Sequence, residues 1–446
     1  MQHYAWAQWN LYFLLKNKKY LKNIKIEHDL ETYSEAQFLL GELARNLNTK
    51  SNFWSNISNK SQRYYKEKYQ IDTVEYIVNL KNSKCKNEFF KIFEKVRDIL
   101  ERLFVDSDYE KFIAHYTNLT VSKLLLSEID NSQIFKLKSM LRLNTINLMN
   151  DPEEGLLINK LLCLNNQIMT KDLAFIACFT LHHDSLNQFR LYAKEGFKEA
   201  SGLSLVLHKD FFSKEHNVAR IYEKQKISKS ISKDSDNSER DNDNGEINTE
   251  GKKMLASMPL YRCIYFDPTS GLIKVAQREE WSFRREFKLE GDHNWFDINT
   301  DTDNIWKEYS SDIDKIEYDV KRGLEELSKL VNKLRINKLN SHEYELLAEI
   351  LLPLRYLMKH MAFKEEQECR IVYVTQMDNS LIQYDDNINR IYINYEPSVM
   401  EYLDKIYIAP KAKEEKMVFE FLCSRGQELR KGKEHVKVKI SQNPFR

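Results

Sequence analysis

Glycine and proline are scarce in this chain, with 11 and 7 residues among 446. Both residues serve the tight turns that connect short strands. Their shortage therefore argues against a fold built mainly from tight hairpins and favours helices joined by plain loops.

The chain also lacks the signatures of metal sites and of disulfide scaffolds. Its six cysteines include no C-x-x-C pair, and no H-E-x-x-H motif or Cys/His group at zinc spacing occurs. We therefore expect reduced, buried thiols and no bound metal.

Long apolar runs and a dominant charge are missing as well. No uninterrupted run approaches the roughly 20 apolar residues of a membrane helix, and the first residues lack the pattern of a signal peptide. Lys plus Arg (68) and Asp plus Glu (67) give a net charge of +1, so no global field attracts nucleic acid or a membrane surface. Composition therefore predicts a cytoplasmic protein that binds no membrane.

Hydrophobic residues make up 42% of the chain and charged residues 30%, which allows a substantial core beneath a well-solvated surface. This length predicts two or three domains. Apolar residues recur at helical spacing within residues 1–105, most clearly at Phe89, Phe93 and Val96. We predict a helical N-terminal region that ends near residue 105, and its helices are a candidate surface for a protein partner.

From residue 106 onward, strand patterns and helix patterns alternate. This order predicts an α+β domain over 106–446. Two insertions interrupt the domain: a polar, aperiodic segment at 224–253 that we expect to be disordered, and a long polar helix at 304–335. An apolar helix is predicted over 342–363. The predicted strands include FIAHY, MLRLNTINLM, LAFIACFT, GLSLVLH, LYRCIYF, DKIYIAP and HVKVKIS.

The run FKEEQECRIVYV is predicted to be one further strand, on which Glu366, Glu368 and Arg370 share a face. Two carboxylates on a rigid strand suit acid–base chemistry or the stabilisation of positive charge. The alternative is a surface ladder of glutamates and an arginine without a catalytic role.

A turn motif, N-D-P-E-E-G, occupies residues 150–155. Asn150 and Asp151 precede a predicted helix, where an Asp side chain is a favoured N-cap. The alternative is that this turn lines a functional cleft.

A basic and aromatic stretch, REEWSFRREFK, mixes Arg278, Arg284 and Arg285 with Trp281 and Phe283. Such a mixture can bind nucleic acid. Three neighbouring glutamates neutralise the arginines, so we predict an ordinary strand with a charged face. The glutamates are Glu279, Glu280 and Glu286.

Eight short blocks follow one another over residues 110–446, outside the two insertions. They are the HYT strand, N-D-P-E-E-G, the Cys-Phe-Thr strand, S-L-N-Q-F-R-L-Y-A, G-L-S-L-V-L, the Glu-x-Glu-x-Arg strand, I-Y-I-A-P and S-Q-N-P-F-R. In this order the blocks resemble the bacterial domain of unknown function 2971 family. Phe189 stands where members of this family carry Trp, so the aromatic character is kept.

That family is itself similar in block order to ADP-ribosyltransferases of the His-Tyr-Glu type. The resemblance implies a split, mostly antiparallel sheet and an enzyme that uses NAD as its substrate. It also implies a macromolecular acceptor for ADP-ribose, and it suits a bacterial toxin or phage-defence effector.

The resemblance implies a role for individual residues. Cleavage of the nicotinamide–ribose bond passes through an oxocarbenium-like state that a carboxylate stabilises, and we assign this role to Glu368 with Glu366 assisting. Tyr192 would stack on nicotinamide, and the alternative is a tyrosine of the hydrophobic core. His115 would bind ribose, and the alternative is a structural histidine. Arg190 would bind a phosphate, unless it is a solvated surface residue. Thr117 and Ser185 would also contribute to cofactor binding. The cleft wall would contain Asn150, Asp151 and Arg370.

Two other functions remain open at this point. A metal-dependent nuclease would hold Mg²⁺ with Asp151, Glu366 and Glu368, although no lysine follows on the predicted glutamate strand. A non-enzymatic binding module would dock a partner through its N-terminal helices.

Overall fold

The described part of the chain belongs to one compact unit that spans Tyr64–Arg446. The first helices predicted for the N-terminal region, Asn150, Asp151 and most of the segment 224–253 lie outside the described residues. The computed structural model describes residues 77, 80, 83–105, 108–127, 140–145, 155–164, 173–213, 215–216, 226–228, 253–257, 260–289, 299–334, 339–375, 377–430 and 432–445.

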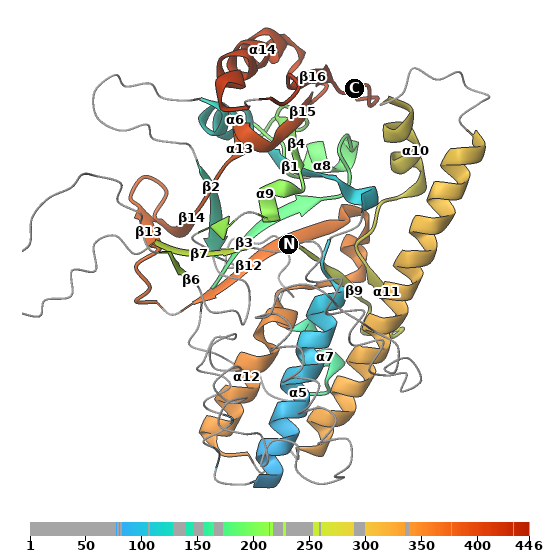
Figure 1. Cartoon of the computed structure of the whole chain (residues 1–446), viewed down its shortest axis with the longest axis vertical. Helices are drawn as coiled ribbons and strands as arrows, with labels where there is room; N and C mark the ends of the chain where they lie inside the picture. The colour runs from blue at the N-terminus through green and yellow to red at the C-terminus, as the bar shows by residue number, and fades with distance from the viewer. Residues whose placement is uncertain are drawn as a thin grey trace, which may run out of the picture. The chain divides into compact units, whose positions relative to one another are not determined.

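A mostly antiparallel sheet forms the centre of this unit (Figure 1). All of its pairings are antiparallel except that of β15 with β16. The strands are β1 (Phe112–Thr117), β2 (Met140–Thr145), β3 (Leu173–Thr180), β4 (Leu203–His208), β8 (Tyr261–Arg262), β12 (Glu368–Thr375), β13 (Ile382–Asp385), β14 (Arg390–Ser398), β15 (Leu403–Ile408) and β16 (Lys437–Ile440).

Strand β3 is the point at which the sheet branches. It pairs with β12 along its whole length on one side. On the other side, β2 pairs with it at Phe175 and Ile176, and β1 pairs with it at Thr180. One branch continues through β14 and β13, and the other through β4, β15 and β16. The apolar runs that predicted these strands are confirmed, because both faces of β3 are covered and its residues are largely buried.

Two three-stranded sheets complete the β structure. In the first, β9 (Ile264–Phe266) pairs antiparallel with β10 (Ile273–Val275) and parallel with β11 (Met358–His360). In the second, β7 (Lys253–Ser257) lies between β5 (Glu215–His216) and β6 (Lys226–Ser228).

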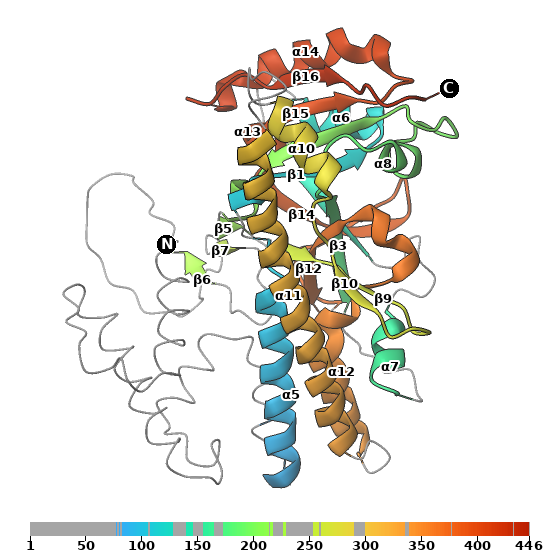
Figure 2. The ribbon, with the colours of Figure 1, turned by 90° about the vertical axis from the view of Figure 1, so that its right-hand side faces the viewer.

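Three long helices lie side by side, and the longest of them also runs alongside the sheet up to α10 (Glu280–Leu289) (Figures 1 and 2). Helix α5 (Ser83–Arg102) contacts both α11 (Asn299–Lys333) and α12 (Ser341–Arg355). A helix is present in each of these predicted segments, although α12 is shorter than predicted. In the described part of the chain, no helix is both long and apolar enough to cross a membrane. The domain boundary near residue 105 stays a prediction, although α5 packs against helices that follow it.

Short helices surround the branch that ends in β16. Helix α8 (Leu186–Leu191) follows β3 and covers one face of β1 and β4, where Phe189 is fully buried against Tyr116. The others are α6 (Leu119–Leu126), α9 (Asp210–Ser213), α13 (Val399–Tyr402) and α14 (Lys416–Arg425). Helix α7 (Leu157–Leu161) lies elsewhere, against α12 and β11.

The strand predicted for the basic and aromatic stretch is wrong, because residues 280–289 form helix α10 (Glu280–Leu289). Phe283 and Glu286, one turn apart, are both buried. Arg284 pairs with Glu280 one turn earlier. Helical spacing therefore explains this stretch better than strand alternation.

The apolar helix predicted over 342–363 is too long. Helix α12 continues through Pro353 and ends at Arg355. The chain then forms β11 and a 3₁₀ helix, Met361–Glu366. Strand β11 is fixed by its parallel pairing with β9, a contact that no local pattern contains.

Candidate functional site

Glu368 and Arg370 form a buried ion pair at the start of β12. Arg370 donates from Nε to Glu368 Oε1 at 2.7 Å and from Nη2 to Oε2 at 3.0 Å. Its remaining Nη1 donates to the Tyr356 carbonyl at 2.7 Å, and the arginine is fully buried. This two-pronged pairing is the strongest geometry for a guanidinium and a carboxylate, so Glu368 is held rigidly.

The sequence predicted that Glu366 and Glu368 lie on one strand, but Glu366 lies before the strand that carries Glu368. It ends the 3₁₀ helix, and Gln367 between the two glutamates adopts the left-handed region at φ 45° and ψ 49°. The prediction of one continuous strand face fails because this residue turns the chain.

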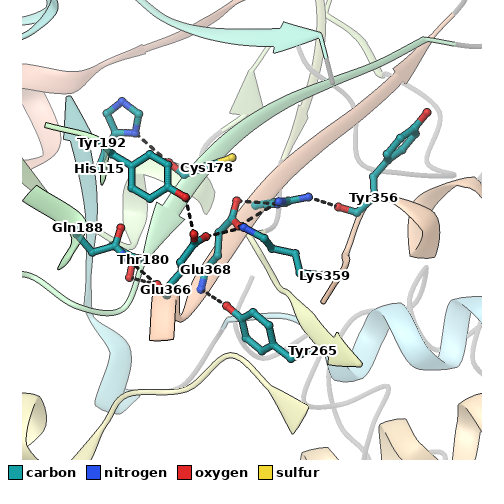
Figure 3. Close-up of polar contacts among 11 residues, drawn as sticks. His115, Cys178, Thr180, Gln188, Tyr192, Tyr265, Tyr356, Lys359, Glu366 and Glu368 are labelled. Carbon is teal, nitrogen blue, oxygen red and sulfur yellow. Dashed lines mark hydrogen bonds and ion pairs between the residues drawn. The ribbon is translucent and has the colours of Figure 1, made fainter. Parts of the chain in front are cut away.

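A lysine that the sequence did not single out joins the two glutamates. Lys359 Nζ donates to Glu366 Oε2 at 2.5 Å and to Glu368 Oε2 at 2.7 Å (Figure 3). All three side chains are buried. Lys359 belongs to β11, within the segment predicted as helix, so its position was hidden. A lysine inside an apolar run was the available signal, because burying an unpaired ammonium is costly.

Tyr192 approaches the same cluster from the end of α8. Its Oη donates to Glu366 Oε1 at 2.6 Å, and its ring is half-buried (Figure 3). Burial and the Glu366 charge raise the pKa of Tyr192 above its usual range, so the phenol keeps its proton. The predicted proximity of Tyr192 to the glutamates is thus present in the structure.

The backbone around the glutamates is also fixed by side chains. The Glu366 carbonyl accepts from Thr180 Oγ1 at 2.7 Å and from Gln188 Nε2 at 3.1 Å. The Glu368 N–H donates to Tyr265 Oη at 2.7 Å. These bonds come from β3, α8 and β9, so three separate elements hold the cluster in place (Figure 3).

The electrostatics of the cluster favour full ionisation of Glu368 and Lys359. Burial raises the pKa of Glu368, but the charges of Arg370 and Lys359, with hydrogen bonds from Arg370 and the Cys178 thiol, outweigh it and hold that pKa well below its usual value. Burial lowers the pKa of Lys359, but the charges of Glu368 and Glu366 outweigh it and raise that pKa.

The register of the sheet places Glu368 opposite Thr180, and Thr180 opposite Ala114. Paired residues on neighbouring strands share a face. Ala114 packs in a small apolar cluster with Phe189, next to Tyr192. The charged cluster therefore lies on the face of the sheet that α8 covers.

His115 does not join this cluster. Strand alternation places it on the face of Ile113, which belongs to the larger core. Its ring packs against Phe179 of that core at 5.5 Å, and its Nδ1 is 2.9 Å from the Cys178 carbonyl. Burial lowers the pKa of His115 and favours the neutral ring. The structure thus gives His115 the surroundings of a structural histidine. By the same alternation, Thr117 also lies on that face.

Ser185 is the N-cap residue of α8, and Arg190 lies within the helix. The Ser185 N–H donates to Tyr116 Oη at 2.8 Å, and its hydroxyl makes no capping bond to the helix that follows. Arg190 is exposed and pairs with Glu199 at 3.1 Å. Neither side chain contacts the glutamates, and Asn150 and Asp151 lie outside the described residues.

The closing S-Q-N-P-F-R block holds the loop that precedes α8. Asn443 Nδ2 donates to Asp184 Oδ1 at 2.9 Å, and Arg285 Nη2 donates to Asp184 Oδ2 at 2.6 Å. The C-terminal block therefore fixes the start of the helix that carries Tyr192.

Within the described part of the chain, no group of three or more His, Cys, Asp or Glu side chains is arranged to hold a metal ion. The facing oxygens of Glu366 and Glu368 already share the Lys359 ammonium. Comparison of the chain with protein-family models, curated proteins and solved structures gives no match. The candidate site consists of two glutamates, a lysine, an arginine and a tyrosine.

Proposed function

We propose that this protein cleaves the nicotinamide–ribose bond of NAD and transfers ADP-ribose to a macromolecular acceptor. The observation that carries the proposal is the 2.6 Å contact between Tyr192 Oη and Glu366 Oε1. It joins a partly exposed aromatic ring, able to stack on nicotinamide, to a carboxylate able to stabilise a cationic ribose.

Within this proposal Glu366, rather than Glu368, is the acting carboxylate. A carboxylate has about four acceptor sites. Glu368 spends its sites on Arg370, Lys359 and the Cys178 thiol. Glu366 accepts side-chain bonds from Tyr192 and Lys359, so acceptor capacity remains for a ribose hydroxyl or an incoming nucleophile.

The other residues of the cluster act as positioning groups. Lys359 orients the Glu366 carboxylate, and the pair of Glu368 and Arg370 fixes Lys359 in turn. A preorganised carboxylate needs no reorganisation when positive charge develops on the ribose during bond cleavage. A toxin or phage-defence role is a further proposal, and it rests only on the resemblance of the sequence blocks to the bacterial domain of unknown function 2971 family.

The test is nicotinamide release from NAD by the purified full chain. We expect Glu366→Gln to lower the rate by at least about a hundredfold, the scale of losing one electrostatic contact in a transition state. Glu365→Gln is the matched control, because Glu365 is the preceding residue, is exposed and contacts Asn187 of α8. Absence of nicotinamide release by the wild-type chain would contradict the proposal.

A parallel assay with Mg²⁺ and nucleic acid addresses the nuclease alternative. A metal ion shared by Glu366 and Glu368 would need the carboxylate oxygens that already accept hydrogen bonds from Lys359. We therefore expect no metal-dependent cleavage that depends on Glu366. If the chain binds a protein partner but neither cleaves NAD nor cleaves nucleic acid, the non-enzymatic binding module is favoured.

A further inference from the structure

Trp281 forms an exposed aromatic surface near the start of α10. Its side chain is 49% exposed, and its indole Nε1 donates to Glu279 Oε2 at 2.7 Å. A single exposed tryptophan needs no explanation by itself. This one is distinguished by what lies behind it.

The His182 ring stacks behind Trp281. The two ring centroids are 5.7 Å apart, with an interplanar angle of 19°. His182 is only 3% exposed, and its buried Nδ1 has no hydrogen-bond partner among the described residues. A buried polar atom without a partner costs about 1–3 kcal/mol, so the stacked arrangement is retained at an energetic cost.

Burial also lowers the pKa of His182 and favours its neutral ring. The neutral His182 imidazole and the Trp281 indole form a stack of two nearly parallel rings. One side of Trp281 is therefore covered by a ring, and about half of its side chain (49%) is exposed to solvent.

The side chain beside this surface favours a particular edge of that third ring. Glu279 is partly exposed and uses Oε2 to accept from Trp281, while its Oε1 has no partner among the described residues. A carboxylate oxygen accepts hydrogen bonds and so selects a donor on the ligand. An aromatic ring can stack on any base, and an acceptor at the edge of the stacked base favours one that carries an amino group.

We infer that the exposed face of Trp281 binds the adenine ring of an adenine nucleotide, and that Glu279 accepts a hydrogen bond from its exocyclic amino group. Among the aromatic side chains of the described part, this one combines exposure, a stacked ring behind it and an adjacent carboxylate oxygen without a partner.

The surface is linked closely to the glutamate cluster. Thr180 Oγ1 donates to the Glu366 carbonyl at 2.7 Å and accepts from the His182 N–H at 3.2 Å. The assignment of this adenine to NAD rests on the proposed function, whereas adenine binding itself does not.

Calorimetric titration of the full chain with AMP and with IMP tests the inference. AMP contains no nicotinamide–ribose bond, so its binding is independent of NAD cleavage. IMP lacks the amino group, and we expect it to bind at least about fivefold more weakly. Trp281→Ala should weaken AMP binding by about tenfold to a hundredfold, the scale of one base stacked on an aromatic ring. Trp281→Phe should retain most of it.

Two further variants separate specific effects from general ones. Glu279→Gln replaces one acceptor oxygen by an amino donor, so it should weaken AMP binding and should not weaken the binding of IMP, which has a carbonyl oxygen in place of the amino group. Phe197→Ala removes a fully exposed phenylalanine elsewhere and should change neither. Equal affinity for AMP and IMP, or absence of AMP binding by the wild-type chain, would overturn the inference. AMP binding without nicotinamide release would retain it and reject the proposed function.

Discussion

Tyr192 and Glu366 lie 174 residues apart in the chain, yet Tyr192 Oη donates to the Glu366 carboxylate at 2.6 Å. The contact joins the end of α8 to the end of the 3₁₀ helix before β12. It depends on Gln188 and Thr180, which fix the Glu366 carbonyl from two sides. The site is therefore a product of the junction between α8 and the sheet.

Tyr192→Phe should remove this hydrogen bond and keep the aromatic ring. A hydrogen bond to a charged group contributes about 1.5–3 kcal/mol, so the free energy of unfolding should fall by up to that amount in urea titrations. Under the proposed function, kcat should fall while KM for NAD changes little. Tyr318→Phe is the control, because Tyr318 is 64% exposed and lies in α11. An equal loss of stability in both variants would contradict the prediction.

Lys359→Met should be strongly destabilising. It leaves Glu366 and Glu368 facing each other without their shared cation, and breaking a buried ion pair costs about 3–5 kcal/mol. The control is Lys364→Met, which changes a partly exposed lysine of the neighbouring 3₁₀ helix. Urea unfolding at neutral pH measures both. A loss below about 1 kcal/mol for Lys359→Met would show that the glutamates are solvated.

Acid should destabilise the fold through Glu368. Because folding lowers the pKa of Glu368, its ionised form contributes stability above its unfolded pKa of about 4.3. That contribution is lost as pH falls from this value toward the folded pKa. Urea titrations between pH 7 and pH 3 should show a flatter decline for Glu368→Gln than for the wild type. Glu365→Gln should keep the wild-type slope, and identical slopes in all three proteins would refute the assignment.

Gln367 tests the left-handed turn between the glutamates. Gln367→Gly and Gln367→Val both lose the side-chain oxygen that accepts from the Gln277 N–H, so their difference isolates the backbone. A β-branched residue at φ 45° is strained by about 1–3 kcal/mol, whereas glycine is not. Thermal unfolding should therefore rank glycine above valine. The reverse order would mean that this turn is not left-handed.

Gly202 permits the close approach of β4 to β1 and α8. A Cβ there would lie 2.3 Å from the Thr117 carbonyl oxygen and 3.0 Å from Ala193 Cα. Backbone atoms cannot move aside cheaply, so Gly202→Ala should destabilise by about 1–3 kcal/mol or more. Gly323→Ala should cost less, because its nearest contact is the flexible side chain of Ile99 at 2.8 Å. Equal losses would argue that the strands can separate locally.

Local patterns were sufficient for the elements with a regular apolar period. Helix α5 shows buried residues at helical spacing, and β3 is a nearly continuous apolar run. Each pattern reflects burial of one face or of both faces, so the residues themselves record the element that they form. The mostly antiparallel arrangement follows the α+β expectation, while the transferase-like fold stays a proposal.

Local patterns failed where a distant partner decides the conformation. The mixture of charged and aromatic residues in α10 is interpreted from the sequence as a strand with a charged face, but Phe283 and Glu286 are buried together on one side of a helix. Lys359 lies on a strand because β9 is beside it. Glu366 leaves the strand because Gln367 turns left-handed in a buried position.

The sequence by itself determined a mixed chain of helices and strands and the presence of two glutamates and an arginine near residues 366–370. Only the tertiary structure decided that Lys359 and Tyr192 complete the cluster. It also decided that His115 lies on the other face of the sheet, against the larger core, and that Trp281 stacks on His182. The physical reason is that periodicity reports burial along one element. Which charged groups meet depends on strand pairing and helix packing between segments far apart in the chain.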